Sequence, residues 1–167
     1  FDYLIVNPPY GVGWKSETEF VKNEKGDPNG RFFVGIPRVS DGSLLFLQSL
    51  IHKMEPSGSR IGIVFNGSPL FTGDSGSGES EIRKWIIEND WLETIVQLPD
   101  RMFFNTGITT YLWIVTNKKK SNRKGKVQLI NGSKHFQIMR KNLGEKGKET
   151  TPENRDQILS TYLNFEE

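Results

Sequence analysis

The sequence contains no cysteine in its 167 residues. Disulfide bonds and cysteine-ligated zinc sites are therefore excluded, and we expect a protein of the reducing cytoplasm. His52 has no partner at metal-ligand spacing, so no metal site is predicted. No apolar run reaches the ~18 residues that a membrane-spanning helix needs, so we expect no contact with a membrane.

An excess of charge of either sign is also lacking. Lysine and arginine number 22 against 20 acidic residues, which gives a net charge of +2 and a sequence pI of 8.8. This mildly basic balance permits nucleic-acid binding without requiring it. The chain opens inside a predicted strand and without an initiator methionine, so we expect a fragment of a longer protein.

Proline is concentrated where the first predicted strand ends. The apolar, β-branched run at 3–6 indicates a buried strand, and Asn7, Pro8, Pro9 and Tyr10 follow it. The prolines fix their own φ angles and lack an N–H, and Pro8 also disfavours the α region for Asn7. This tetrapeptide is thus a stiff turn at the carboxyl end of a strand, where open α/β sheets bind ligands.

The atoms of this turn suit an exocyclic amine. Asn7 offers a carbonyl acceptor, and Pro8 cannot donate but holds a second carbonyl in place. Two fixed acceptors match the two hydrogens of an NH2 group, and Tyr10 adds a flat face on which a planar base can stack. The alternative is a rigid turn that only closes a loop.

Asn-Pro-Pro-Tyr after a buried strand resembles the catalytic motif of S-adenosylmethionine-dependent amino-methyltransferases, above all the DNA adenine-N6 enzymes. Three further segments, 41–54, 79–90 and 98–107, are similar to the modification subunit of type I restriction-modification systems. The resemblance implies catalytic roles for Asn7, Pro8, Pro9 and Tyr10. It also implies S-adenosylmethionine as cofactor, held mainly by residues upstream of Phe1, and as partners DNA, a specificity subunit and a restriction subunit.

The periodicity predicts an α/β fold, and the resemblance makes it part of a Rossmann-like methyltransferase with helices on the faces of a mixed sheet. Strands are predicted near 2–7, 60–66, 92–98, 108–116 and 126–131, and helices near 43–54 and 79–89. The short linker 100–106 predicts an antiparallel pair of strands at the C-terminal side. We divide the chain into a catalytic-motif half, 1–131, and an extension, 132–167, with an amphipathic helix.

Two other stretches are candidate DNA contacts. Arg31 and Phe32 combine a cation with an aromatic ring inside a long polar loop at 11–42, which we expect to be a lid or a binding loop. The alternative is that Phe32 and Phe33 anchor this loop to the core. Lys118, Lys119 and Lys120 belong to a basic run at 117–126, which either contacts a phosphate backbone or a partner protein, or is a solvated hairpin tip.

Two other functions stay open at this point. Protein-glutamine methyltransferases also use Asn-Pro-Pro-Tyr, there on a side-chain amide. A non-catalytic module for binding DNA or protein is the other alternative.

Overall fold

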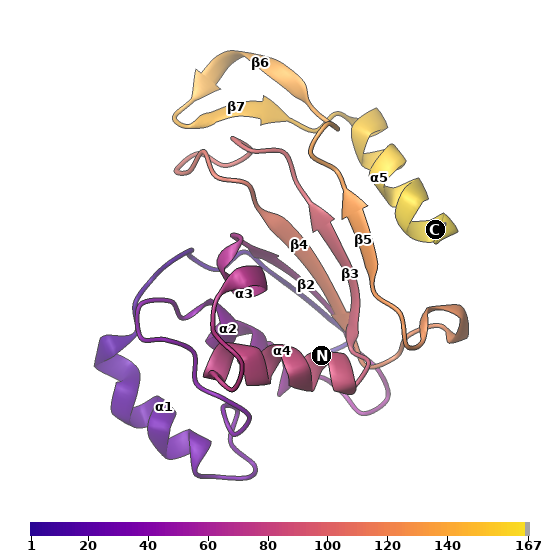
Figure 1. Cartoon of the computed structure of the whole chain (residues 1–167). Coiled ribbons are helices and arrows are strands. Elements are labelled where there is room, and N and C mark those ends of the chain that lie inside the picture. Colours follow the sequence, from indigo (N-terminus) through magenta and orange to yellow (C-terminus); the bar gives the residue numbers. More distant parts are fainter. Residues whose placement is uncertain (166–167) are drawn as a thin grey trace.

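The computed structural model describes residues 1–165, and a five-stranded mixed sheet forms its centre (Figure 1). The strands are β1 (Tyr3–Val6), β2 (Arg60–Phe65), β3 (Leu92–Gln97), β4 (Tyr111–Thr116) and β5 (Gln128–Asn131), in the order β1-β2-β4-β3-β5. β1 pairs with β2 in parallel and β3 with β5 in parallel, whereas β4 runs antiparallel to both β2 and β3. The predicted α/β class, the five strands and the antiparallel pair β3–β4 are thus confirmed.

One face of the sheet is covered by α2 (Ser43–Ile51) and α4 (Gly78–Glu88). Ile61, Ile63 and Phe65 alternate along β2 and are fully buried on this face, where the helices contribute Leu47 and Ile82. This period of two matches the pleat of a strand. Both helices are fixed at their starts: the Asp41 carboxylate accepts from the Ser43 N–H, and the Ser77 hydroxyl accepts from the Ser80 N–H.

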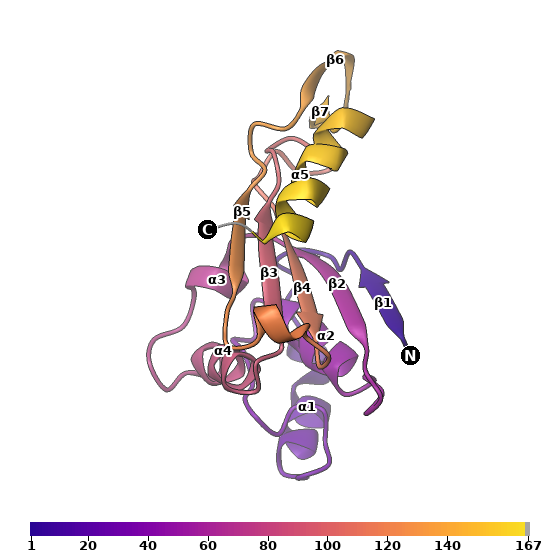
Figure 2. The ribbon, with the colours of Figure 1, turned by 90° about the vertical axis from the view of Figure 1, so that its right-hand side faces the viewer.

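The opposite face carries α5 (Pro152–Asn164), which lies across the strands in Figure 2. Thr151 and Asn154 form a reciprocal capping box, with Pro152 at the first helical position. The helix expected in the extension is present. Its Leu159 and Leu163 are 50% and 60% exposed, and the Tyr162 hydroxyl makes polar contacts with Arg60 and Glu93 of the sheet.

Several short elements were not predicted. The stretch 11–42 holds η1 (Lys15–Glu17) and α1 (Thr18–Lys25), and 66–78 holds α3 (Ser68–Phe71). Beyond the sheet, β6 (Gln137–Leu143) and β7 (Lys146–Glu149) form a separate antiparallel hairpin. These elements bury few side chains, Val21 alone in α1, so they leave little hydrophobic periodicity in the sequence.

The basic stretch 117–126 is not a hairpin tip, which corrects one of the two interpretations. β5 pairs with β3 and not with β4, so this segment passes the start of β3 and includes η2 (Ser121–Arg123). The boundary proposed between 131 and 132 falls where β5 ends. No helix within residues 1–165 is long and apolar enough to cross a membrane.

Candidate functional site

The Asn-Pro-Pro-Tyr turn lies at an edge of the sheet where several chain segments meet. Since β1, β2, β3 and β5 point the same way, their carboxyl ends share this edge with the start of β4. Asn7 follows β1 directly, and the 66–78 and 98–110 connections begin at the same edge. This edge is where open sheets bind ligands.

Within the turn, Asn7 is exposed, Pro8 is buried and Tyr10 is half-buried. The Tyr10 hydroxyl donates a hydrogen bond of 2.7 Å to Asn7 Oδ1. Burial raises the pKa of Tyr10 to about 12, so the hydroxyl stays protonated and remains a donor at neutral pH. The acceptor oxygen that an amine would need, Asn7 Oδ1, therefore lies at the surface. In this structure it accepts from the Tyr10 hydroxyl instead of from an amine.

A second aromatic side chain stands beside this turn. The Phe103 ring meets the Tyr10 ring edge to face, with centroids 6.2 Å apart and planes at 79°. Phe103 belongs to the connection between β3 and β4, where it forms an isolated bridge with Thr106. The segment 98–107 was noted for its resemblance to the modification subunit, but Phe103 within it was not singled out. Only the folded sheet brings this residue to Tyr10, about 90 residues away in the chain.

The stretch after Tyr10 is bound to the end of its own loop. Gly11 turns the chain with a φ of +62°, a conformation that favours glycine. The Trp14 N–H then donates to the Val39 carbonyl, and the Gly42 N–H donates to the Val12 carbonyl, each at 3.0 Å. These bonds fix both ends of the 11–42 segment close to the turn.

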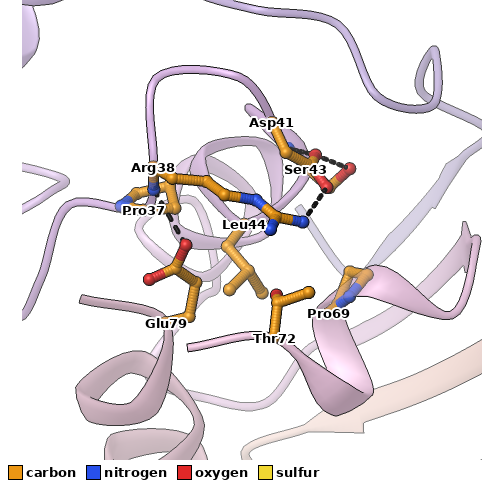
Figure 3. Close-up of a pocket in the computed structure, with 8 residues that line it drawn as sticks. All are labelled: Pro37, Arg38, Asp41, Ser43, Leu44, Pro69, Thr72 and Glu79. Atoms are coloured by element: carbon orange, nitrogen blue, oxygen red, sulfur yellow. Dashed lines mark hydrogen bonds and ion pairs between the residues drawn. The ribbon is translucent and has the colours of Figure 1, made fainter. Parts of the chain in front are cut away.

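Arg38 connects this segment to the neighbouring loop (Figure 3). Its backbone N–H donates to the buried Glu79 carboxylate at 2.9 Å, and its guanidinium donates to the Ser68 hydroxyl at 2.6 Å. Arg38 and Glu79 also line a hollow of about 10 Å³, which is at the lower limit for one water and too small for a base. The Arg38 contacts therefore hold two loops together at the edge that carries Asn7.

Comparison with known proteins assigns this arrangement to a family. Residues 1–167 match the family model described as N-6 DNA Methylase. The chain belongs to the N-6 DNA methylase family. It is 32% identical to the type I restriction enzyme MjaVII methylase subunit of Methanocaldococcus jannaschii, over 99% of this chain and 28% of that protein.

Two further relatives are similar. The HindI methylase subunit of Haemophilus influenzae is 31% identical over 77% of this chain and 27% of its own length. The solved methyltransferase subunit of a type I restriction-modification system from Streptococcus thermophilus superposes with a TM-score of 0.81 and 29% identity. That match covers 100% of this chain and 32% of the neighbour. The chain thus spans roughly 30% of the length of these relatives.

In this member of the family, the Arg31–Phe32 pair serves the structure of the loop. Phe32 is 4% exposed and packs with Trp14, Val21 and Leu45 in a small second core, so it anchors the loop as the alternative predicted. Phe33 is 45% exposed, and its ring meets the ring of Trp85 edge to face. The Arg31 guanidinium pairs with Glu24 and lies 4.8 Å from the centre of the Phe32 ring. Phe32 is therefore not placed to stack on a base, and the Arg31 side chain is already paired.

The predicted lysines lie at the opposite end of the sheet from Asn7. They follow β4, whose last residue Thr116 pairs with Arg60 at the start of β2. Lys119 is 8% exposed and its ammonium binds the Asp90 carboxylate at 2.5 Å. Lys118 and Lys120 are exposed, but a strand of six residues separates them by about 20 Å from the edge that carries the turn.

The described residues do not complete a cofactor site beside Asn7. β1 is the outermost strand of the sheet, and Tyr3 and Ile5 on it are 74% and 89% exposed. The glycines after Tyr10, Gly11 and Gly13, follow two prolines and lack the third glycine of a dinucleotide-binding turn. Within residues 1–165, the side of β1 away from β2 therefore has no wall against which a nucleoside could pack.

Proposed function

We propose that the full-length protein methylates adenine N6 in DNA as the modification subunit of a type I restriction-modification complex in the cytoplasm. S-adenosylmethionine would supply the methyl group, bound mainly by residues outside this chain. DNA, a specificity subunit and a restriction subunit are the proposed partners. The observation that carries the proposal is the exposed Asn7 acceptor at the end of β1, next to the aromatic pair Tyr10 and Phe103.

The proposed role of the turn follows from its hydrogen bonds. An adenine flipped out of the duplex presents an NH2 group, and Asn7 Oδ1 with the Pro8 carbonyl would accept its two hydrogens. This holds N6 in one orientation, and orientation alone can be worth up to ~7–11 kcal/mol of the barrier. Because Asn7 Oδ1 now accepts from Tyr10, the hydroxyl must turn away when the base enters.

A substrate panel tests the proposal. Methyl transfer from labelled S-adenosylmethionine should reach duplexes that contain the recognised adenine and not a peptide with an accessible glutamine. Duplexes with N6-methyladenine at the target should take up no further label. Transfer to the peptide alone would assign the protein to the glutamine methyltransferases, and no transfer to either would leave the non-catalytic alternative.

Substitution of Tyr10 separates its ring from its hydroxyl. Tyr10→Ala should weaken capture of the flipped base by ~1–3 kcal/mol, or about 5- to 150-fold, because stacking is lost. Tyr10→Phe keeps the ring and should retain wild-type turnover, since the hydroxyl competes with the base for Asn7 Oδ1. Fluorescence of 2-aminopurine at the target position measures capture, and a Phe variant as weak as the Ala variant would contradict the stacking role.

The isolated 167-residue chain should neither bind S-adenosylmethionine at micromolar concentration nor transfer methyl groups, because the described residues leave β1 uncovered. Titration calorimetry with cofactor should show no heat of binding. The unpaired edge of β1 should instead promote self-association, which sedimentation would detect as a concentration-dependent rise in mass. Ile5→Lys places a charge on this strand and should reduce that association. A clear cofactor heat would show that the 11–42 segment forms the site.

A further inference from the structure

The hairpin β6–β7 is attached to the loop that carries Phe103. The Glu145 N–H donates to the Phe104 carbonyl, and the N–H groups of Gly147 and Lys148 both donate to the Arg101 carbonyl, at 3.0 to 3.2 Å. The Lys148 ammonium also binds the Asp100 carboxylate at 2.5 Å. Figure 1 shows the hairpin beyond the tip of the β3–β4 connection. Because β1 and β3 run in the same direction, this is the edge of the sheet at which Asn7 follows β1.

This attachment leaves little room for the hairpin to shift. A Cβ on Gly144 would lie 2.5 Å from the Phe104 carbonyl oxygen, and one on Gly147 would lie 2.7 Å from the Arg101 guanidinium. Arg101 itself has a φ of +55°, which is uncommon for a residue with a side chain. The strained Arg101 accepts two hydrogen bonds from β7 through its carbonyl, so the hairpin has a defined position relative to the loop that carries Phe103. Because Phe103 contacts Tyr10, the hairpin also has a defined position relative to Tyr10.

The hairpin is basic. Between 137 and 149 it contains four cationic residues (Arg140, Lys141, Lys146 and Lys148) against Glu145 and Glu149, a net charge of +2 from 4 − 2. Lys148 is paired with Asp100, and the Lys146 ammonium lies 5.5 Å from the centre of the Phe104 ring. Arg140 and Lys141 are exposed, and neither forms an ion pair with any residue in 1–165.

We propose that the β6–β7 hairpin binds the phosphate backbone of the DNA duplex that flanks the flipped adenine, through Arg140 and Lys141. This inference rests on the proposed function. A duplex that delivers a base to Asn7 must run past this edge of the sheet, and the hairpin stands there with cations that no described acidic group neutralises. Phosphate contacts position a protein on DNA without reading its sequence, and exposed cationic side chains suit that task.

A protein partner is the competing occupant, because Ile138 and Leu143 on β6 are also exposed, at 77% and 43%. These two residues are five positions apart, and the exposed Arg140, Lys141 and Asn142 lie between them in the sequence. An interface between proteins typically has a core depleted of charge. The charges and the position at the site edge therefore favour DNA.

The test measures duplex binding by the full-length protein, assembled with its partner subunits, across a series of KCl concentrations. Fluorescence anisotropy of a labelled duplex that carries the target site gives the dissociation constant at each concentration. The variant Arg140→Ala/Lys141→Ala is compared with Lys118→Ala/Lys120→Ala, which removes two exposed cations at the other end of the sheet. The exchange Arg140→Lys/Lys141→Arg keeps both charges.

Loss of two phosphate contacts should lower the slope of log K against log salt by about 2 and weaken binding roughly 10- to 60-fold at 0.1 M salt. The control pair and the charge-preserving exchange should keep the wild-type slope. An unchanged slope in the hairpin variant overturns the inference, and so does loss of a partner subunit in size-exclusion chromatography with no change in slope. In both cases wild-type methylation of adenine would still support the proposed function, whereas a wild type that neither binds nor methylates DNA refutes both.

Discussion

Replacement of Asn7 by alanine should lower the rate of adenine methylation roughly 10²–10³-fold. Removal of a single fixed hydrogen-bonding group that acts on the reacting centre has effects of this size in other enzymes. Asn7 Oδ1 is the acceptor that would hold one N6 hydrogen, and the Pro8 carbonyl alone cannot fix the orientation of the amine. Single-turnover transfer of labelled methyl groups to a duplex at saturating enzyme measures the effect without a contribution from product release.

The structure supplies controls for this prediction. The Asn7 side chain is exposed and accepts a hydrogen bond from the exposed end of Tyr10, its hydroxyl, so alanine should change thermal stability little. Asn122→Ala, at an exposed position at the far end of the sheet, should leave the rate unchanged. Asn7→Asp keeps an acceptor and should lose less activity than alanine. Cofactor affinity should be wild type in all three, and an Asn7→Ala rate near wild type would refute the proposed clamp.

The strands and helices of the sheet were predictable because burial imposes a period on them. β2 alternates fully buried Ile61, Ile63 and Phe65 with less buried residues, and α4 begins with a capping serine and acidic residues in its first turn. The Asn-Pro-Pro-Tyr turn was predictable for a similar reason, since two prolines directly after an apolar run restrict the backbone to few conformations.

Other features depend on contacts that the sequence does not reveal. Phe103 joins Tyr10 only because β3 and β1 end at the same edge. The run of lysines after β4 suggested a phosphate-binding surface, yet Lys119 is buried against Asp90 and the run lies at the wrong end of the sheet for the turn. Strand β6 is almost entirely exposed, and β7 has the sequence Lys-Gly-Lys-Glu, so no apolar alternation indicated the hairpin.

One buried carboxylate holds α5 to the sheet, beside a hydrogen bond of 2.9 Å from the Gln128 side chain of β5 to the Thr161 carbonyl. No residue of this helix is buried within the described chain, so apolar packing contributes little to its position. Glu93 on β3 is 1% exposed and binds the Arg60 guanidinium, and its Oε2 accepts from the Tyr162 hydroxyl at 2.9 Å. Arg123 lies 3.9 Å from the same carboxylate and donates to the Tyr162 carbonyl. One anion thus neutralises two arginines and fixes Tyr162 of α5.

Glu93→Gln should therefore lower the free energy of unfolding by about 3 kcal/mol. Loss of one partner from a buried ion pair costs 3–5 kcal/mol, and the lower end applies because the Arg60 side chain is 32% exposed. Thermal unfolding followed by circular dichroism should show a fall in Tm of roughly 6–12 °C for a chain of this size. Glu88→Gln, which changes an exposed carboxylate on α4, is the matched control and should leave Tm unchanged.

Release of α5 gives this prediction a second readout. Without the Glu93 charge, the Tyr162 hydroxyl can donate only a weaker bond, to the glutamine amide oxygen, and both arginines are left with uncompensated charge beneath the helix. The helix should then detach before the sheet unfolds, since local opening follows the weakest contacts. Trypsin should cleave after Arg155 faster in Glu93→Gln than in the control at a temperature where both retain the sheet. Equal cleavage rates together with a Tm within 2 °C of wild type would show that α5 is held by contacts other than this carboxylate.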